Sequence, residues 1–148
     1  MTASPRRSKR PRAAAGLLAR RLALLALFED EFRPGSGQAA LERLSDERSI
    51  PDEVREHAAG IVRGVDEHRA DLDARIAVEA PLIPVTELGR VERTILRSAL
   101  YEVLYSAATP SGETMRDAVS LARIYAGDAA RRLVNGVLGS VSRSGGGA

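Results

Sequence analysis

The chain has 148 residues, the length of one domain or of two small packed lobes, and its 44% of hydrophobic residues is enough for a buried core. The absence of cysteine excludes disulfides, thiolate zinc sites and cysteine nucleophiles. Residues 1–21 carry seven basic and no acidic side chains, whereas the rest of the chain carries 15 basic against 20 acidic ones. A basic segment attached to an acidic body predicts an anionic partner for that segment.

The N-terminal segment, residues 1–12, is rich in basic residues and prolines but shows no apolar periodicity. Burial of apolar surface therefore cannot offset the entropy of ordering it, and we expect a disordered arm. Its basic side chains are those of Arg6, Arg7, Lys9, Arg10 and Arg12.

From residue 13 to about 32, leucines and alanines occupy nearly every side of a helix, which is typical of a central helix covered by several others. Pro34 and Gly35 end this helix. Arg20 and Arg21 interrupt its apolar stretch, and the run that remains is far shorter than the roughly 20 residues needed to span a bilayer. No signal-peptide cleavage pattern follows, so we expect a cytoplasmic protein with no membrane contact; an organellar transit peptide is the weaker alternative.

Two further helices are predicted in the N-terminal half, a short one over about 37–48 and a long one that starts near Pro51. The hydroxyl of Ser49 is expected to cap the long helix, and the two acids after Pro51 stabilise the positive end of its dipole. Gly60 and Gly64 would permit a bend or a close helix crossing.

Three helices are predicted in the C-terminal half, after the proline-containing segment 80–87. The first ends near Ser106, and a turn at residues 109–112 leads into the second. Gly127 closes the second helix, and Asp128 is expected to cap the third.

The pattern as a whole predicts an all-α fold of roughly six or seven helices in two lobes, because no alternating strand is present. The N-terminal lobe is expected over about 13–79 and the C-terminal lobe over about 80–141, with a flexible tail at 142–148.

The sequence offers few groups that could carry out catalysis. His57 and His68 would lie about 16 Å apart on one helix, too far to share a metal. We interpret His68 as a residue at the core edge, His57 as one facing solvent, and the acidic run 29–31 as a solvated face. No phosphate-binding loop or nucleophile motif is present. We therefore expect no enzymatic activity, cofactor or metal site.

The basic residues are more informative. Each basic side chain of the arm could neutralise a phosphate, and Arg20 and Arg21 extend this charge onto the first helix. Such a segment fits RNA, with a basic solubility tail as the alternative. Because only five residues are aromatic, an RNA contact would rest on charge and shape rather than on base stacking. A later basic stripe is expected to make ion pairs within the chain; it consists of Arg90, Arg93 and Arg97.

Four segments together carry a family resemblance. They are ARRLALLALFEDE at 19–31, VERTILRSALYEVLY at 91–105, DAVSLARIYA at 117–126 and LVNGVLGSV at 133–141. The first is similar to the opening helix, and the other three to the C-terminal half, of the NusB family of transcription antitermination proteins. With the long middle helix as a weaker match, the resemblance covers about residues 17–141.

The resemblance implies two three-helix lobes that bind a boxA RNA element of ribosomal RNA leader transcripts together with NusE, a small-subunit ribosomal protein. This pair helps to hold RNA polymerase in a processive antitermination complex, without catalysis or cofactor. Matching motifs place Arg20 and the basic residues before it on RNA, and Phe28 and Glu92 on the NusE-facing surface. The matching residues interpreted as structural are Arg97, Tyr101 and Glu102. The resemblance also allows a homodimer, which would compete with partner binding.

The chain departs from the family pattern at three places: before the Ala-Arg pair, at Arg116 in place of an asparagine, and near Leu82 and Ile83, where a tryptophan is usual. Gly16, Leu17 and Leu18 stand where basic residues are expected directly before the Ala-Arg pair, so the basic cluster lies further upstream. Asn135, in the family's N-G step, is expected to be a buried amide.

Two alternative functions stay open: an RNA-binding domain that serves a ribosomal RNA-modifying enzyme, and a helical structural protein with a basic tail.

Overall fold

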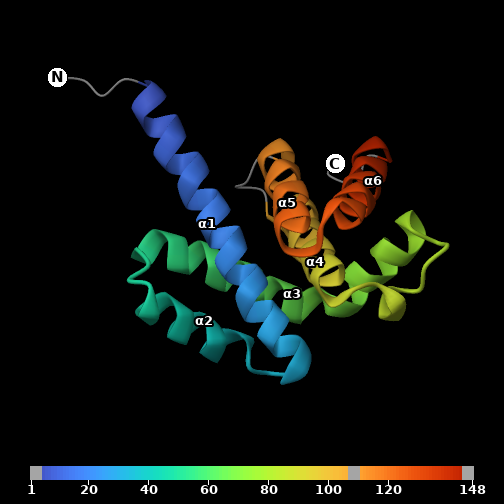
Figure 1. The fold of residues 1–148 in the computed structure, drawn as a ribbon, viewed down its shortest axis with the longest axis horizontal. Helices are drawn as coiled ribbons and strands as arrows, with labels where there is room; N and C mark the ends of the chain where they lie inside the picture. Colours follow the sequence, from blue (N-terminus) through green and yellow to red (C-terminus); the bar gives the residue numbers. More distant parts are fainter. Residues whose placement is uncertain (1–4, 107–110, 145–148) are drawn as a thin grey trace.

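The computed structural model describes residues 5–106 and 111–144, with side chains from Arg12 onward and without that of Ser111. This part of the chain folds into six α-helices and one short 3-10 helix and contains no strand, which confirms the predicted all-α fold (Figure 1). The elements are α1 (Pro5–Phe32), α2 (Gly37–Glu47), α3 (Asp52–Glu79), η1 (Val85–Glu87), α4 (Arg90–Tyr105), α5 (Ser111–Ala126) and α6 (Asp128–Arg143).

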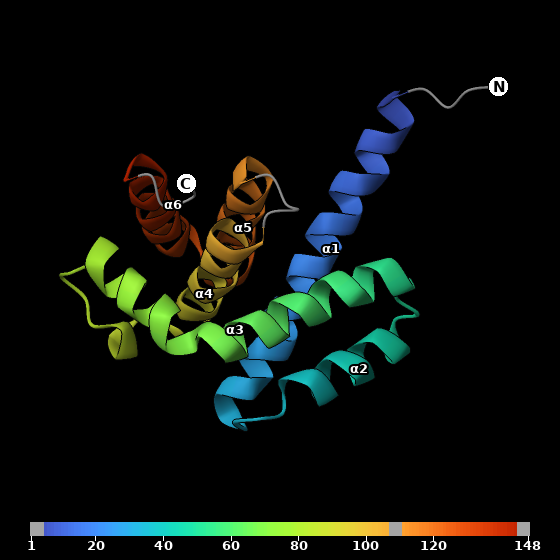
Figure 2. The same ribbon diagram turned by 180° about the vertical axis from the view of Figure 1, so that it is seen from behind.

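The first helix begins earlier than the sequence suggested. α1 starts at Pro5, so the expected disordered arm is helical over residues 5–12, while residues 1–4 lie outside the described part. Pro5 is tolerated in the first helical turn, and arginine and lysine favour the helix over the coil, whereas Pro11 lacks the N–H for one backbone hydrogen bond of this helix. The basic segment thus forms a helical extension about 12 Å long. It projects beyond the other helices in both views (Figure 1, Figure 2).

The turn after α1 is held by Asp30. Its Oδ1 accepts hydrogen bonds from the backbone N–H of Gly35 at 2.9 Å and of Gly37 at 3.1 Å. Gly35 has a φ of +93°, a conformation that glycine adopts easily. α1 therefore ends at Phe32, as predicted, and α2 begins directly after the turn.

α3 differs from the prediction at its start. Ser49 does not cap the helix, because its φ is +50° and Pro51 occupies the N-cap position without a side-chain hydrogen bond. Further along, the backbone leaves helical geometry at His68, with φ −113° and ψ 16°. Gly64 provides the predicted close crossing, since a methyl group there would overlap the ring of Tyr101 on α4.

The C-terminal helices follow the predicted order. α4 ends at Tyr105, and the turn expected at 109–112 lies mostly outside the described residues. Gly127, with a φ of +93°, ends α5 and is itself the N-cap of α6, so Asp128 is the first helical residue rather than a cap. α6 runs to Arg143, two residues into the expected flexible tail.

The helices pack as two groups of three. α1 contacts α2 and α3, and α4 contacts α5 and α6. α1 also contacts α4 and α5. α3 crosses α4 on the face of the molecule that Figure 2 shows. Alanines on the middle of α1 are fully buried and permit this close packing; they are Ala19, Ala23 and Ala26. The lobe boundaries 13–79 and 80–141 stay a prediction.

Candidate nucleic-acid and partner interfaces

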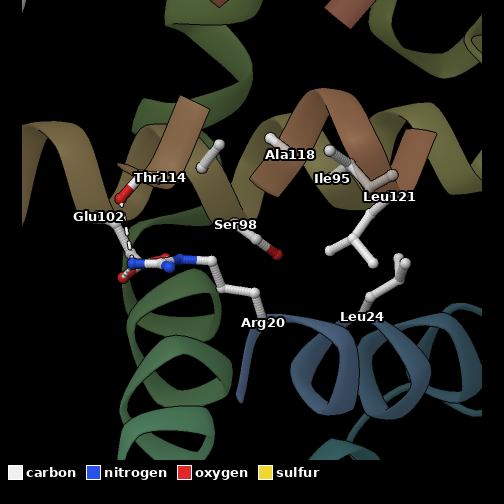
Figure 3. A pocket seen from close by; sticks show the side chains of 9 residues that line it. Arg20, Leu24, Ile95, Ser98, Glu102, Thr114, Ala118 and Leu121 are labelled. Carbon is white, nitrogen blue, oxygen red and sulfur yellow. Dashed lines mark hydrogen bonds and ion pairs between the residues drawn. The ribbon is translucent and has the colours of Figure 1, made fainter. Parts of the chain in front are cut away.

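A buried charged network surrounds Arg20, in the middle of α1. Its guanidinium donates to both carboxylate oxygens of Glu102 on α4, from Nε at 2.8 Å and from Nη2 at 3.2 Å (Figure 3). Nη1 donates to Asp117 on α5 at 2.7 Å, and Nη2 also donates to the hydroxyl of Thr114 at 3.3 Å. Arg20 is only 6% exposed. This Arg20 network therefore joins α1, α4 and α5 inside the molecule.

His57 on α3 adds a fourth helix to the Arg20 network. Its Nε2 lies 3.0 Å from Oε2 of Glu102, so the prediction that His57 faces solvent is wrong. Burial would raise the pKa of the Glu102 carboxyl, but hydrogen bonds from His57 and Arg20 and their charges outweigh burial and lower that pKa. Burial likewise opposes ionisation of Arg20, yet Glu102 and Asp117 raise the pKa of the guanidinium. Arg20 and Glu102 are thus both charged near neutral pH.

The cavity beside Arg20 is too small for a substrate. It measures about 20 Å³, roughly the space of one water molecule, and apolar side chains such as Leu24, Ile95 and Leu121 line much of it (Figure 3). Within residues 5–106 and 111–144, no group of three or more metal-binding side chains comes together. Among the described helices, none combines the length and the apolarity that crossing a bilayer requires.

The structure separates the predicted RNA contacts into two kinds. Arg20 lies inside, and a phosphate could reach it only by displacing Glu102 or Asp117, which corrects its prediction as an RNA contact. Arg12 and Arg21, in contrast, are exposed. Four more basic residues lie on the helical extension, although their side chains are outside the described part: Arg6, Arg7, Lys9 and Arg10.

Arg21 lies on the surface between α1 and α5. Its Nε donates to the hydroxyl of Tyr125 at 2.8 Å, and its guanidinium lies 5.9 Å from the centre of that ring. Leu17 and Leu18, which replace the basic residues expected at this place, are partly buried against the core. The basic residues of α1 are therefore concentrated toward its N-terminal end.

A second charged network lies near the C-terminal end of α1. Glu31 accepts hydrogen bonds from Arg93 and, at 3.0 Å, from Arg97. Arg97 also donates to both carboxylate oxygens of Asp73, at 2.7 and 2.8 Å. The predicted pairing of the α4 basic stripe within the chain is confirmed for Arg93 and Arg97. The predicted solvated acidic face is wrong for Glu31 and for Asp30, which is 7% exposed.

The residues predicted to face NusE lie near the same junction of α1 and α4. Phe28 packs edge-on against Phe32 with ring centroids 5.2 Å apart, and Phe32 is 57% exposed. The guanidinium of Arg90 lies 4.5 Å from the centre of the Phe32 ring, and Glu92 follows two residues later on α4. We call Phe28, Phe32 and Arg90 the aromatic surface, because contacts join these three residues. Sequence reasoning missed Phe32 and Arg90, although Phe32 lies one helical turn after Phe28.

Other matched residues divide in the same way between core and surface. Arg97, Tyr101 and Glu102 make contacts between helices, as expected of structural residues. Asn135 is exposed on α6, so the prediction of a buried amide is wrong.

Comparisons with known proteins identify the family. The model of the NusB family matches residues 17–143. The chain belongs to the NusB family. The transcription antitermination protein NusB of Herpetosiphon aurantiacus is 38% identical over 125 residues, which cover 82% of this chain and 86% of the relative. NusB of Symbiobacterium thermophilum is also 38% identical, over 133 residues that cover 84% of this chain and 87% of the relative.

Solved structures agree with this assignment to the NusB family. The crystal structure of antitermination factors NusB and NusE in complex with dsRNA superposes with a TM-score of 0.79 at 27% identity, covering 90% of this chain and 98% of that one. The predicted resemblance and NusB-like fold are thereby confirmed. As a NusB family member, the chain is a transcription antitermination factor and not an enzyme.

Proposed function

We propose that this NusB family member binds boxA-type single-stranded RNA of ribosomal RNA leader transcripts together with the ribosomal protein NusE. The observation that carries the proposal is α1 itself, a single helix with a buried middle and a projecting basic end. The solved relative that contains NusB, NusE and RNA has the same fold and supports both partners. In the cytoplasm, the complex then joins RNA polymerase and promotes processive transcription of ribosomal RNA.

In this proposal the RNA backbone lies along the N-terminal part of α1. The phosphate contacts are Arg6, Arg7, Lys9, Arg10, Arg12 and Arg21. Arg20 does not touch RNA but fixes α1 against α4 and α5, which sets the direction in which the basic end projects.

NusE binds at the opposite end of α1 in this proposal, on the aromatic surface that includes Phe28 and at Glu92 in the first turn of α4. A helix of 28 residues is about 42 Å long. RNA and NusE can therefore occupy α1 at the same time, and each partner meets a surface of different chemistry: basic for the RNA, aromatic and charged for the protein.

The RNA contacts are tested by titrating a labelled boxA-like RNA and a scrambled control with the chain and NusE over a salt series. We expect tighter binding of boxA and, for six phosphate contacts, a log–log salt slope of about −4. Arg21→Ala should flatten that slope by about 0.7, whereas Arg48→Ala, at an exposed position after α2, should leave it unchanged. Equal affinity for both RNAs would contradict boxA recognition, and no binding would favour the helical structural alternative.

The partner surface is tested by calorimetric titration with NusE. Glu92→Lys should weaken NusE binding by about tenfold. The lysine would place a positive charge against a NusE surface that is complementary to the Glu92 carboxylate. Glu53→Lys changes an exposed acid on α3 and is the matched control. Equal affinities of the two variants for NusE would show that Glu92 does not lie in the interface. Light scattering of the free chain, with and without NusE, reports whether a homodimer forms and whether NusE dissociates it.

A further inference from the structure

Three aromatic rings form a stack where α3 and α4 cross. His68 and Tyr105 lie almost parallel, with ring centroids 3.9 Å apart and an interplanar angle of 17°. Tyr101 lies 6.0 Å from each of them. The sequence has only five phenylalanine and tyrosine residues, so this is an unusual local concentration of rings in a chain for which base stacking seemed excluded by composition.

The stack is built by the backbones of two helices rather than by a loop. Gly64 lets the ring of Tyr101 approach α3 closely. One turn later, the non-helical conformation of His68 accompanies the stacking of its imidazole on Tyr105. A kink in a helix that carries neither proline nor glycine at the kink itself calls for a local cause, and the ring contact supplies one. The rings are therefore held in place before any ligand arrives.

Tyr105 is the exposed member of the stack. It is the last residue of α4 and is 44% exposed, whereas Tyr101 and His68 are half-buried. A tyrosine that is supported by another ring and nearly half-exposed is a preorganised platform for a flat partner. Unpaired nucleic-acid bases are partners of this kind, because every base has a π-face.

The platform lies within reach of the proposed RNA-binding surface. α5 begins at Ser111, and the carboxylate of its Glu113 lies against Gly16 of α1, four residues after exposed Arg12. Only five residues connect Tyr105 to Ser111, a distance of at most about 20 Å for an extended chain. A single strand bound to the N-terminal part of α1 could thus reach Tyr105 within a few nucleotides.

We propose that Tyr105, backed by His68, stacks on one base of the RNA that α1 binds. The proposal rests on the proposed RNA-binding function and adds a base contact to a surface that charge alone had defined. Stacking on an aromatic residue contributes about tenfold or more to affinity per base. Because a neutral ring releases no counterions, this contribution should not change the salt dependence of binding.

The test compares Tyr105→Leu, which keeps apolar bulk without a π-face, with Tyr105→Phe, which keeps the ring. Both are titrated with boxA-like RNA over a salt series, alone and with NusE. We expect Tyr105→Leu to bind about tenfold more weakly at an unchanged salt slope. Tyr105→Phe should stay within about twofold of the wild type, because the ring that stacks is retained. Ile124→Ala, which removes an exposed apolar side chain of α5, is the matched control and should bind normally. Circular dichroism confirms that all variants keep their helices.

A second readout locates the stacked base. BoxA-like RNAs carrying 2-aminopurine at successive positions should show quenching at one position with the wild type and Tyr105→Phe, and none with Tyr105→Leu. Equal affinity and quenching for wild type and Tyr105→Leu would overturn the platform and leave the proposed function intact. A flatter salt slope of RNA binding by Tyr105→Leu would also overturn the platform. So would weaker binding of NusE to Tyr105→Leu in the absence of RNA. If the wild type binds no RNA, the platform and the proposed function both fail.

Discussion

Arg20 and Arg21 are neighbours in the sequence, yet they belong to different environments. Successive residues point about 100° apart around a helix, so Arg20 meets Glu102 and Asp117 while Arg21 meets Tyr125 at the surface. The carboxylates that pair with the Arg20 guanidinium are 82 and 97 residues away in the chain. Local sequence therefore identifies both residues as basic but cannot distinguish the one that is available to RNA from the one that is not.

Removal of the buried guanidinium should be strongly destabilising. Arg20→Ala leaves Glu102 and Asp117 buried without the guanidinium that pairs with both, and we expect the free energy of unfolding to fall by about 3–5 kcal/mol. Arg43→Ala breaks an exposed pair with Glu29 and should lower it far less, because water screens the two charges. Urea unfolding followed by circular dichroism measures both. Similar losses in the two variants would mean that burial adds nothing to the importance of Arg20.

The Glu31 carboxyl should make stability depend on pH. Burial would raise its pKa, but the hydrogen bonds and charges of Arg93 and Arg97 lower it below the ordinary value of 4.5. The ionised carboxylate therefore stabilises the fold above that value, and its contribution is lost as the pH falls through the lowered folded-state pKa. We expect the free energy of unfolding to fall as the pH drops below the ordinary value of 4.5. The fall should be less steep in Glu31→Gln, as urea unfolding at several pH values would show. Glu56→Gln, at an exposed position on α3, should keep the wild-type slope.

At the scale of helices, periodicity predicted the order and most of the ends, because the apolar stripes face one common core. What it missed depends on local backbone geometry and on other helices. The start of α1 at Pro5 reflects helix propensity in a segment without a stripe. The displaced cap before α3 reflects the left-handed conformation of Ser49, and the irregularity at His68 accompanies rings on α4.

The crossing of α3 and α4 should tolerate no side chain at Gly64. Gly64→Ala would push a methyl group into the ring of Tyr101, and we expect a loss of about 1–3 kcal/mol in the free energy of unfolding. Gly136→Ala is the matched control on α6, where a methyl group meets nothing within 4 Å. Because alanine favours the helix over glycine, it should stabilise by about 0.5–1 kcal/mol. Thermal unfolding distinguishes the two, and a neutral Gly64→Ala would show that Tyr101 can move away.

For the whole molecule, one contiguous core contains buried residues from all six described helices. α1 contacts four other helices, so neither group of three has a core of its own. We expect a single cooperative unfolding transition in which the calorimetric enthalpy equals the van't Hoff enthalpy. Scanning calorimetry measures the ratio of these enthalpies, and a ratio well above one would mean that the two groups unfold separately.

The candidate site was less predictable than the fold. The family resemblance supplied Phe28 and Glu92, and composition supplied the basic end of α1, because both are properties of single segments. Phe32 with Arg90, and the stack that contains Tyr105, arise from contacts between distant segments. Such juxtapositions become visible only when the helices are placed in space.

The division of the arginines into an interior and a surface set has a consequence for how the molecule can change. An interior arginine such as Arg20 cannot be replaced without weakening the fold, whereas Arg12 is exposed and its replacement leaves the Arg20 network untouched. Affinity for nucleic acid can thus change at such a surface position without a change in thermodynamic stability. The binding strength could drift to suit a different transcript or a different intracellular salt concentration while the core stays as it is.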